Sequence, residues 1–152
     1  MVRARVRTRL LTSPTMNDPR RAPEGHPWGP QPTPYEAIGG DVRVRALSDA
    51  FYDRIEAESP GLRAMLPRDT STSRQKLYEF LSGWMGGPQL YIERRGHPRL
   101  RMRHFPFTIG EAEANEWARC MELAMDDTGV DGALRSFLSE RFHQSAHHVR
   151  NR

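Results

Sequence analysis

The sequence predicts a single all-α domain built from about four helices. Apolar residues recur at three- and four-residue steps in four stretches of the chain, the spacing that aligns side chains on one helix face. No stretch alternates apolar and polar residues over the length of a strand, and clusters of glycine and proline separate the periodic stretches. The length of 152 residues suits one domain with one hydrophobic core.

The first periodic helix is expected over residues 41–57, after a short helical turn at 35–38 that a glycine pair ends. A second short turn is expected over residues 60–66, because Pro67 cannot continue a helix. The apolar face of the 41–57 helix consists of Leu47, Ala50, Phe51 and Ile55.

The most regular periodicity predicts a helix that Ser71 or Thr72 caps at its start. The Gly-Gly-Pro run at 86–88 ends it, since glycine accepts the left-handed cap conformation and proline cannot continue the helix. The apolar face of this helix consists of Leu77, Phe80, Leu81, Trp84 and Met85.

Two further helices are expected near the C-terminus. The run Thr-Ile-Gly-Glu at 108–111 has the spacing of a capping box and predicts the start of the first one. A last helix is expected from Asp131 onward. Their apolar faces consist of Trp117, Cys120, Met121, Ala124 and Met125, and of Leu134, Phe137, Leu138, Phe142 and Val149. Residues 90–107 show no clear period, and so long an irregular connection in a small domain is often functional.

Residues 1–34 are expected to form a disordered arm before a domain that spans 35–149. Six prolines and two glycines within residues 17–34 preclude helix and sheet there. Residues 1–15 contain four arginines and no acidic residue, so the charge of residues 16–152 is +4 − 4 = 0. Three interpretations of residues 1–15 are open: a nucleic-acid-binding arm, a targeting peptide, or an over-extended start with translation beginning at Met16.

The composition argues against several classes of protein. No apolar run approaches the roughly 18 residues of a membrane span, so we expect no membrane partner. A single cysteine, Cys120, excludes an internal disulfide framework and a cysteine-rich zinc site, and it suits a cytoplasmic protein. Since the body of the chain is neutral, we expect no nucleic-acid partner either.

Histidines are the residues most suited to chemistry in this chain. His143 and His147 have the i, i+4 spacing of a metal-ligand pair, but Gln144 stands where the metalloprotease pattern requires glutamate. A solvated helix face is the better interpretation of that pair. His97 lies in a turn-like Gly-His-Pro run, which favours a structural hydrogen bond. His104 precedes Phe-Pro-Phe, so it is either a satisfied core histidine or a ligand facing an apolar cavity.

From residue 34 onward the chain resembles the group II (O-type) truncated haemoglobins. The segments that carry the resemblance are PYEAIGG at 34–40, FY at 51–52, FLSGWMGGP at 80–88, GHPRLRMRHFPF at 96–107 and NEWARCM at 115–121. The resemblance implies a truncated globin fold, a two-over-two helical sandwich around haem b. A loop replaces most of the proximal helix in that fold, which accounts for the irregular segment at 90–107.

The resemblance also implies a role for individual residues. His104 matches the proximal ligand to the haem iron and is the one expected metal ligand. Tyr52 and Trp117 match the distal residues that hydrogen-bond the iron-bound ligand. Leu66 stands where the family usually has an aromatic residue or histidine, and because leucine has no donor, the distal network is reduced to Tyr52 and Trp117. The other expected site residues are Leu77 and Phe80 against the haem, Ser73 at the distal pocket and Lys76 at a haem propionate.

These features predict a haem protein that binds dioxygen reversibly, with nitric oxide and carbon monoxide as other diatomic ligands. Two donors aimed at dioxygen would slow its release, which suits scavenging or redox chemistry better than oxygen transport. The alternative is a haem enzyme, either a nitric oxide dioxygenase or a peroxidase using peroxide. Such an enzyme would need an external reductase, because the sequence has no flavin or nicotinamide motif. A nucleic-acid-binding module that uses the arginine-rich arm is a third hypothesis.

Overall fold

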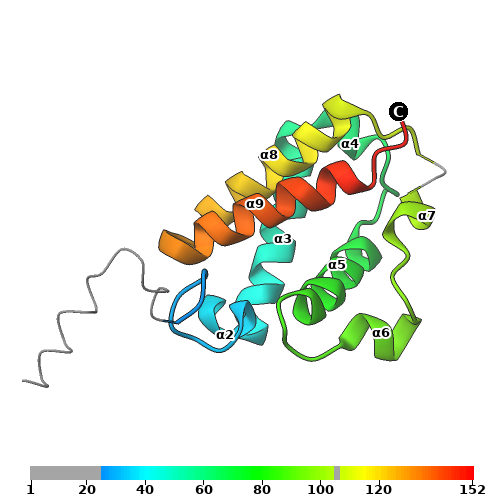
Figure 1. The fold of residues 1–152 in the computed structure, drawn as a ribbon. Helices are drawn as coiled ribbons and strands as arrows, with labels where there is room; N and C mark the ends of the chain where they lie inside the picture. The colour runs from blue at the N-terminus through cyan, green and yellow to red at the C-terminus, as the bar shows by residue number, and fades with distance from the viewer. Residues whose placement is uncertain (1–24, 105–106) are drawn as a thin grey trace, which may run out of the picture.

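A computed structural model describes residues 25–104 and 107–152 of the chain (Figure 1). These residues form helices and no β-strand, so the all-α prediction is confirmed. The long helices are α3 (Asp41–Glu58), α5 (Ser71–Trp84), α8 (Glu111–Asp127) and α9 (Gly132–His148). The short helices are α2 (Pro34–Ile38), α4 (Pro60–Arg63), α6 (Leu90–Arg95) and α7 (Leu100–His104).

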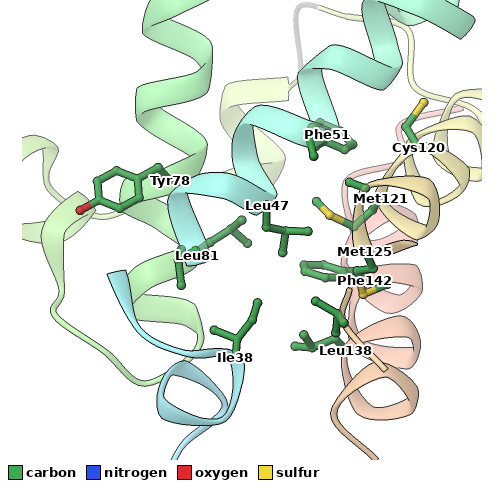
Figure 2. Close-up of a cluster of buried hydrophobic side chains, with 14 of the residues drawn as sticks. Ile38, Leu47, Phe51, Tyr78, Leu81, Cys120, Met121, Met125, Leu138 and Phe142 are labelled. Atoms are coloured by element: carbon green, nitrogen blue, oxygen red, sulfur yellow. The ribbon is translucent and has the colours of Figure 1, made fainter. Parts of the chain in front are cut away.

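The long helices pack as two pairs, α3 with α5 and α8 with α9, and α3 joins the pairs by packing on α8. Figure 1 shows α8 and α9 side by side and running in opposite directions. This is the two-over-two arrangement that the resemblance implied. Figure 2 shows buried side chains between the pairs, among them Phe51, Phe142, Leu47, Leu81, Met121, Met125 and Leu138. Met85 is also fully buried.

Residues 90–104 are more ordered than the sequence predicted, since α6 and α7 lie within them. Helices of five or six residues make too few internal hydrogen bonds to be stable alone, so their order depends on contacts with the rest of the domain. A short helix also shows no apolar period, and for that reason the pattern of the sequence did not reveal either one.

A buried carboxylate attaches α6 to α5. The Glu79 side chain on α5 is only 2% exposed, and it accepts hydrogen bonds from Arg95 Nε at 2.6 Å and an Arg94 guanidinium nitrogen at 3.0 Å. Gln75 donates a third hydrogen bond at 2.8 Å. Burial alone would raise the pKa of Glu79, but these hydrogen bonds outweigh it and hold the pKa at about 2. Glu79 therefore stays ionised and binds the last turn of α6.

Two predicted helix starts are wrong by one or two residues. The first turn of α8 begins at Glu111, and the backbone N–H of Gly110 donates to Glu113 Oε1 at 2.7 Å, so the predicted capping box at 108–111 lies two residues too early. The reason is that Ile109 is held outside the helix by hydrogen bonds with Asn151. Ser71 does not cap α5 but is its first residue.

Residues 25–33 lie against the domain, although the sequence assigned them to a disordered arm. Trp28 donates its Nε1–H to the Gln31 carbonyl at 2.8 Å, and its ring meets that of Phe137 on α9 edge-on at 5.0 Å. The aromatic contact supplies order that proline-rich composition alone does not predict. Residues 1–24, which include the arginine-rich stretch and Met16, lie outside the described residues, and the division of the chain at residue 34 stays a prediction.

The glycine pair after α5 is required by its surroundings. Gly86 has φ +89°, in the left-handed region that favours glycine. A Cβ at Gly87 would lie 2.3 Å from Cδ1 of Tyr35, because the tyrosine ring of α2 packs directly on that backbone. The pair thus ends α5 and also allows α2 to pack against it.

None of the helices in residues 25–104 and 107–152 combines the length and the apolar character that crossing a bilayer requires.

Candidate functional site

A cavity of about 510 Å³ lies among α3, α5, α7, α8 and α9. It brings together every residue that the sequence predicted for the site. The lining includes His104, Tyr52, Trp117, Leu66, Ser73, Lys76, Leu77 and Phe80. These residues come from five separate parts of the chain, so the fold and not local sequence gathers them.

His104 lines this cavity, and one of its ring nitrogens is bonded to the backbone of α7. It is the last residue of α7, and its Nδ1 lies 2.7 Å from the Leu100 carbonyl oxygen one turn earlier. A carbonyl can only accept a hydrogen bond, so Nδ1 carries the proton in the neutral ring and Nε2 keeps its lone pair. This second bond also fixes the ring orientation, as the outer bonds of metal-binding histidines generally do. His104 is therefore prepared as an Nε2 ligand.

Tyr52 brings a protonated hydroxyl to the cavity from α3. Burial raises the pKa of its phenol to about 12, which the neighbouring positive charge of Arg74 offsets only in part. The Arg74 guanidinium carbon lies 5.9 Å from the centre of the Tyr52 ring. No described residue accepts a hydrogen bond from the Tyr52 hydroxyl. Tyr52 is thus a neutral donor that no acceptor in residues 25–104 and 107–152 engages.

Trp117 brings a second donor to the cavity from α8. Its ring lies 5.0 Å from that of Phe51 and meets the ring of Phe142 edge-on at 5.9 Å. The two contacts hold the indole from both neighbouring helices. Within residues 25–104 and 107–152 the indole N–H has no acceptor, so it too is available to a ligand.

One face of α5 forms a wall of the cavity. Ser73, Lys76, Leu77 and Phe80 follow one another at offsets of three, four and seven residues, which places them in a row along the helix. Leu66 lies in the turn after α4 and offers only an apolar side chain. This wall combines an apolar surface with one ammonium group, that of Lys76.

The cavity has further lining residues that the sequence analysis did not assign to it. Arg103, directly before His104, supplies a second cation to the lining in addition to Lys76. Arg103 belongs to the GHPRLRMRH segment and directly precedes the expected iron ligand, and this position could have indicated that it lines the cavity. The aromatic and aliphatic lining also includes Trp84, Tyr91, Phe142 and Val149, of which the sequence placed all but Tyr91 on apolar helix faces.

Three other histidines form contacts away from the cavity lining. The Nδ1 of His97 accepts a hydrogen bond from the backbone N–H of Arg99 at 3.1 Å, so His97 has the structural bond that its turn predicted. His143 pairs with Glu122 at 3.3 Å, and His147 with Asn115 at 3.1 Å. The described part of the chain contains no cluster of three or more metal-ligating side chains.

Comparison with known proteins identifies the family. The family model described as bacterial-like globin matches residues 33–151. The chain belongs to the bacterial-like globin family. It is 43% identical over 118 residues to the group 2 truncated hemoglobin YjbI of Bacillus subtilis, an overlap of 78% of this chain and 88% of that protein. The bacterial-like globin match thus covers the whole helical domain and the chain that follows α9.

Solved structures of globins place the chain within the group II truncated haemoglobins. The group II truncated hemoglobin of Bacillus anthracis has a TM-score of 0.77 and 45% identity, covering 80% of this chain and 98% of its own. The truncated oxygen-avid haemoglobin of Bacillus subtilis has a TM-score of 0.74 and 43% identity, covering 78% and 99%. The fold is therefore a truncated two-on-two globin, and proteins of this family bind haem and diatomic ligands.

The cavity of this globin fits a haem group. Its volume of about 510 Å³ lies within the range of roughly 300–1,000 Å³ that is usual for cofactor and ligand sites. His104 lines it with Nδ1 bonded to Leu100, which leaves Nε2 for the iron, and Lys76 and Arg103 offer positive charge for two propionates. The uncommitted donors of Tyr52 and Trp117 lie in an otherwise largely apolar lining, as a small polar ligand would require.

Proposed function

We propose that this globin binds haem b with His104 as the axial ligand, and that it binds dioxygen reversibly and releases it slowly. A bound haem supplies the iron at which a diatomic ligand binds. The observation that carries the proposal is the position of the His104 ring. Its Nδ1 is committed to the Leu100 carbonyl at 2.7 Å, which leaves the Nε2 lone pair of this cavity-lining residue for the iron.

The donors in the cavity support dioxygen as the ligand. Dioxygen held at the iron of such a haem would carry partial negative charge, so a hydrogen bond from Tyr52 or Trp117 to it would be partly charge-assisted. Tyr52 stays protonated because burial raises its pKa to about 12, and Trp117 donates at any pH. Carbon monoxide is less polar and gains less from the same donors. Slow release is also in keeping with the oxygen-avid haemoglobin of Bacillus subtilis, to which the chain is 43% identical.

Cations at the cavity support the orientation of the haem. Lys76 on α5 and Arg103 on α7 come from different walls of the cavity and can each pair with one propionate. Leu77 and Phe80 line the cavity and pack against the core, and they would provide apolar contact for the porphyrin. Ser73 is small, so it leaves access to the ligand side of the cavity. The reductase, the enzyme alternatives and a cytoplasmic location stay predictions.

Spectroscopy of the purified protein tests the axial ligand. The parent should show a haem absorption spectrum and an iron–histidine stretching band in the resonance Raman spectrum of the ferrous form. His104→Ala should lose that band and bind haem weakly, whereas the matched variant His97→Ala should keep it. If His97→Ala lost the band and His104→Ala kept it, the assignment of the ligand would be wrong.

A further inference from the structure

Asn151 joins the chain after α9 to the segment that follows α7. Its Nδ2 donates to the carbonyl oxygens of Phe107 at 2.8 Å and His104 at 3.4 Å. Its Oδ1 accepts from the backbone N–H of Ile109 at 2.9 Å. Figure 1 shows the C-terminal end of the chain next to α7. One side chain therefore holds three backbone groups that lie more than 40 residues earlier in the sequence.

The orientation of the Asn151 amide is fixed by its partners. The Ile109 N–H can only donate, so the amide oxygen must face it. The two carbonyls can only accept, so the amide nitrogen must face them. With the amide reversed, its oxygen would face the carbonyl oxygens of His104 and Phe107, and its NH₂ group would face the Ile109 N–H, so no hydrogen bond could form on either side. This arrangement is specific to asparagine among residues of similar size, since aspartate has no donor.

The segment that carries His104 depends on contacts of this kind. With five residues, α7 is too short to be stable by its own hydrogen bonds, and the last carbonyls of a helix have no partner within it. The chain leading into α7 is anchored through Arg94 and Arg95 to the buried Glu79 of α5. Asn151 provides the corresponding anchor at the other end of α7, at the carbonyl of His104 itself.

The position of the His104 ring follows from these anchors. Its Nδ1 is bonded to the Leu100 carbonyl within the same short helix, so the ring moves together with α7 as a unit. A shift of that helix would change the distance and tilt of Nε2 relative to the cavity. We propose that Asn151 is a positioning residue for His104, fixing the approach of its Nε2 and so the strength of its axial bond. This inference rests on the proposed role of His104 as the haem ligand.

Asn151→Asp is the sharpest test, since it removes only one half of the contact. Aspartate keeps an oxygen for the Ile109 N–H but brings a negative oxygen, in place of a donor, to the carbonyls of His104 and Phe107. Backbone hydrogen bonds from residues 151 and 152 to the Ile109 carbonyl stay intact, so the C-terminal chain should remain docked. Asn151→Ala removes both halves and serves as the second variant.

Two measurements on the haem-loaded full chain give the result. In Asn151→Asp the iron–histidine stretching band should broaden or move from its position in the parent. Haem transfer to excess apomyoglobin should become about tenfold faster, the equivalent of about 1.4 kcal/mol, as expected for the loss of one or two hydrogen bonds. The control Asn115→Asp makes the same change of charge at an exposed asparagine of α8, and it should match the parent in both measurements.

The outcomes separate this proposal from the proposed function. If His104→Ala loses the stretching band while both Asn151 variants keep the parent band and transfer haem within twofold of its rate, then Asn151 does not position His104 and the ligand assignment stands. If His104→Ala keeps the band, the ligand assignment is wrong and the role of Asn151 is overturned with it. Faster haem transfer with an unchanged band would show that Asn151 stabilises the fold only, and it would also refute the proposal.

Discussion

Removing the two donors of the cavity one at a time tests how this globin controls its ligand. Tyr52→Phe deletes the hydroxyl and keeps the ring, and Trp117→Phe deletes the indole N–H and keeps an aromatic side chain between Phe51 and Phe142. Neither donor has a protein acceptor among the described residues, so neither change leaves a protein group unpaired. The measured effect should therefore report the contact with the ligand.

The expected magnitude follows from the chemistry of the two groups. A hydrogen bond to a charged partner contributes about 1.5–3 kcal/mol, which corresponds to roughly 10- to 150-fold in affinity. Changes of this kind act mainly on the dissociation rate. Tyr52 should act as a donor over the whole range from pH 5 to pH 9, because its pKa is about 12. Each variant should accordingly release dioxygen at least about tenfold faster than the parent over that range.

The double variant tests whether the donors act separately. No hydrogen bond joins Tyr52 to Trp117 within the described residues, so the two free energies should add and the double variant should release dioxygen about 100-fold faster or more. Stopped-flow displacement gives the rates, with carbon monoxide release as the less sensitive comparison. Tyr35→Phe and Trp28→Phe, which lie outside the cavity lining, are the matched controls. Oxygen dissociation rates within about twofold of the parent in both single variants would mean that neither side chain contacts the ligand.

Three further predictions concern stability and the ligand pocket. Glu79→Gln should lower the free energy of unfolding at pH 7 by about 2 kcal/mol. That difference should shrink as the pH falls from 4.5, the ordinary pKa of the carboxyl, to about 2, its pKa in the fold, because the parent then loses its ionised Glu79. Acid denaturation curves in which the difference does not change with pH would contradict this. Gly87→Ala should lower that free energy by about 1–3 kcal/mol because its Cβ would meet the Tyr35 ring, whereas Gly61→Ala has open space and should lie within about 0.5 kcal/mol of the parent in urea titrations. Leu66→Tyr should slow oxygen release in the stopped-flow assay, since it adds a donor at the cavity wall; unchanged or faster release would show that residue 66 does not reach the ligand.

Long helices were the part of the fold most accessible from the sequence. The expected range 41–57 differs from α3 by one residue, and the expected start at Asp131 is the N-cap of α9. Periodicity works here because a helix of several turns repeats its buried face often enough to be recognised. The short helices α6 and α7 were not predicted, because five or six residues are too few for an apolar face to recur.

Contacts between distant parts of the chain were not predictable in this way. Glu79 falls between Tyr78 and Phe80 and looks like an ordinary surface residue of an amphipathic helix, yet its side chain is 2% exposed. Burial of that carboxylate depends on two arginines about 15 residues later in the chain. Asn151 likewise gives no local signal, since its three partners precede α8 whereas Asn151 itself follows α9.

The candidate site also combines features that local sequence predicts with features that only contacts between distant residues reveal. Taken alone, Tyr52 and Trp117 fit the apolar faces of α3 and α8, where an aromatic residue usually serves the core and needs no ligand. Only the complete set of side chains around one cavity distinguishes the two roles, because a core tyrosine or tryptophan normally finds a protein acceptor when it is buried. Here both residues line the cavity that His104 also lines, and neither donor has an acceptor among the described residues. Leaving two donors without a protein acceptor costs free energy, and a ligand that accepts their hydrogen bonds would offset that cost. Removing either donor should therefore change the oxygen dissociation rate more than the free energy of unfolding.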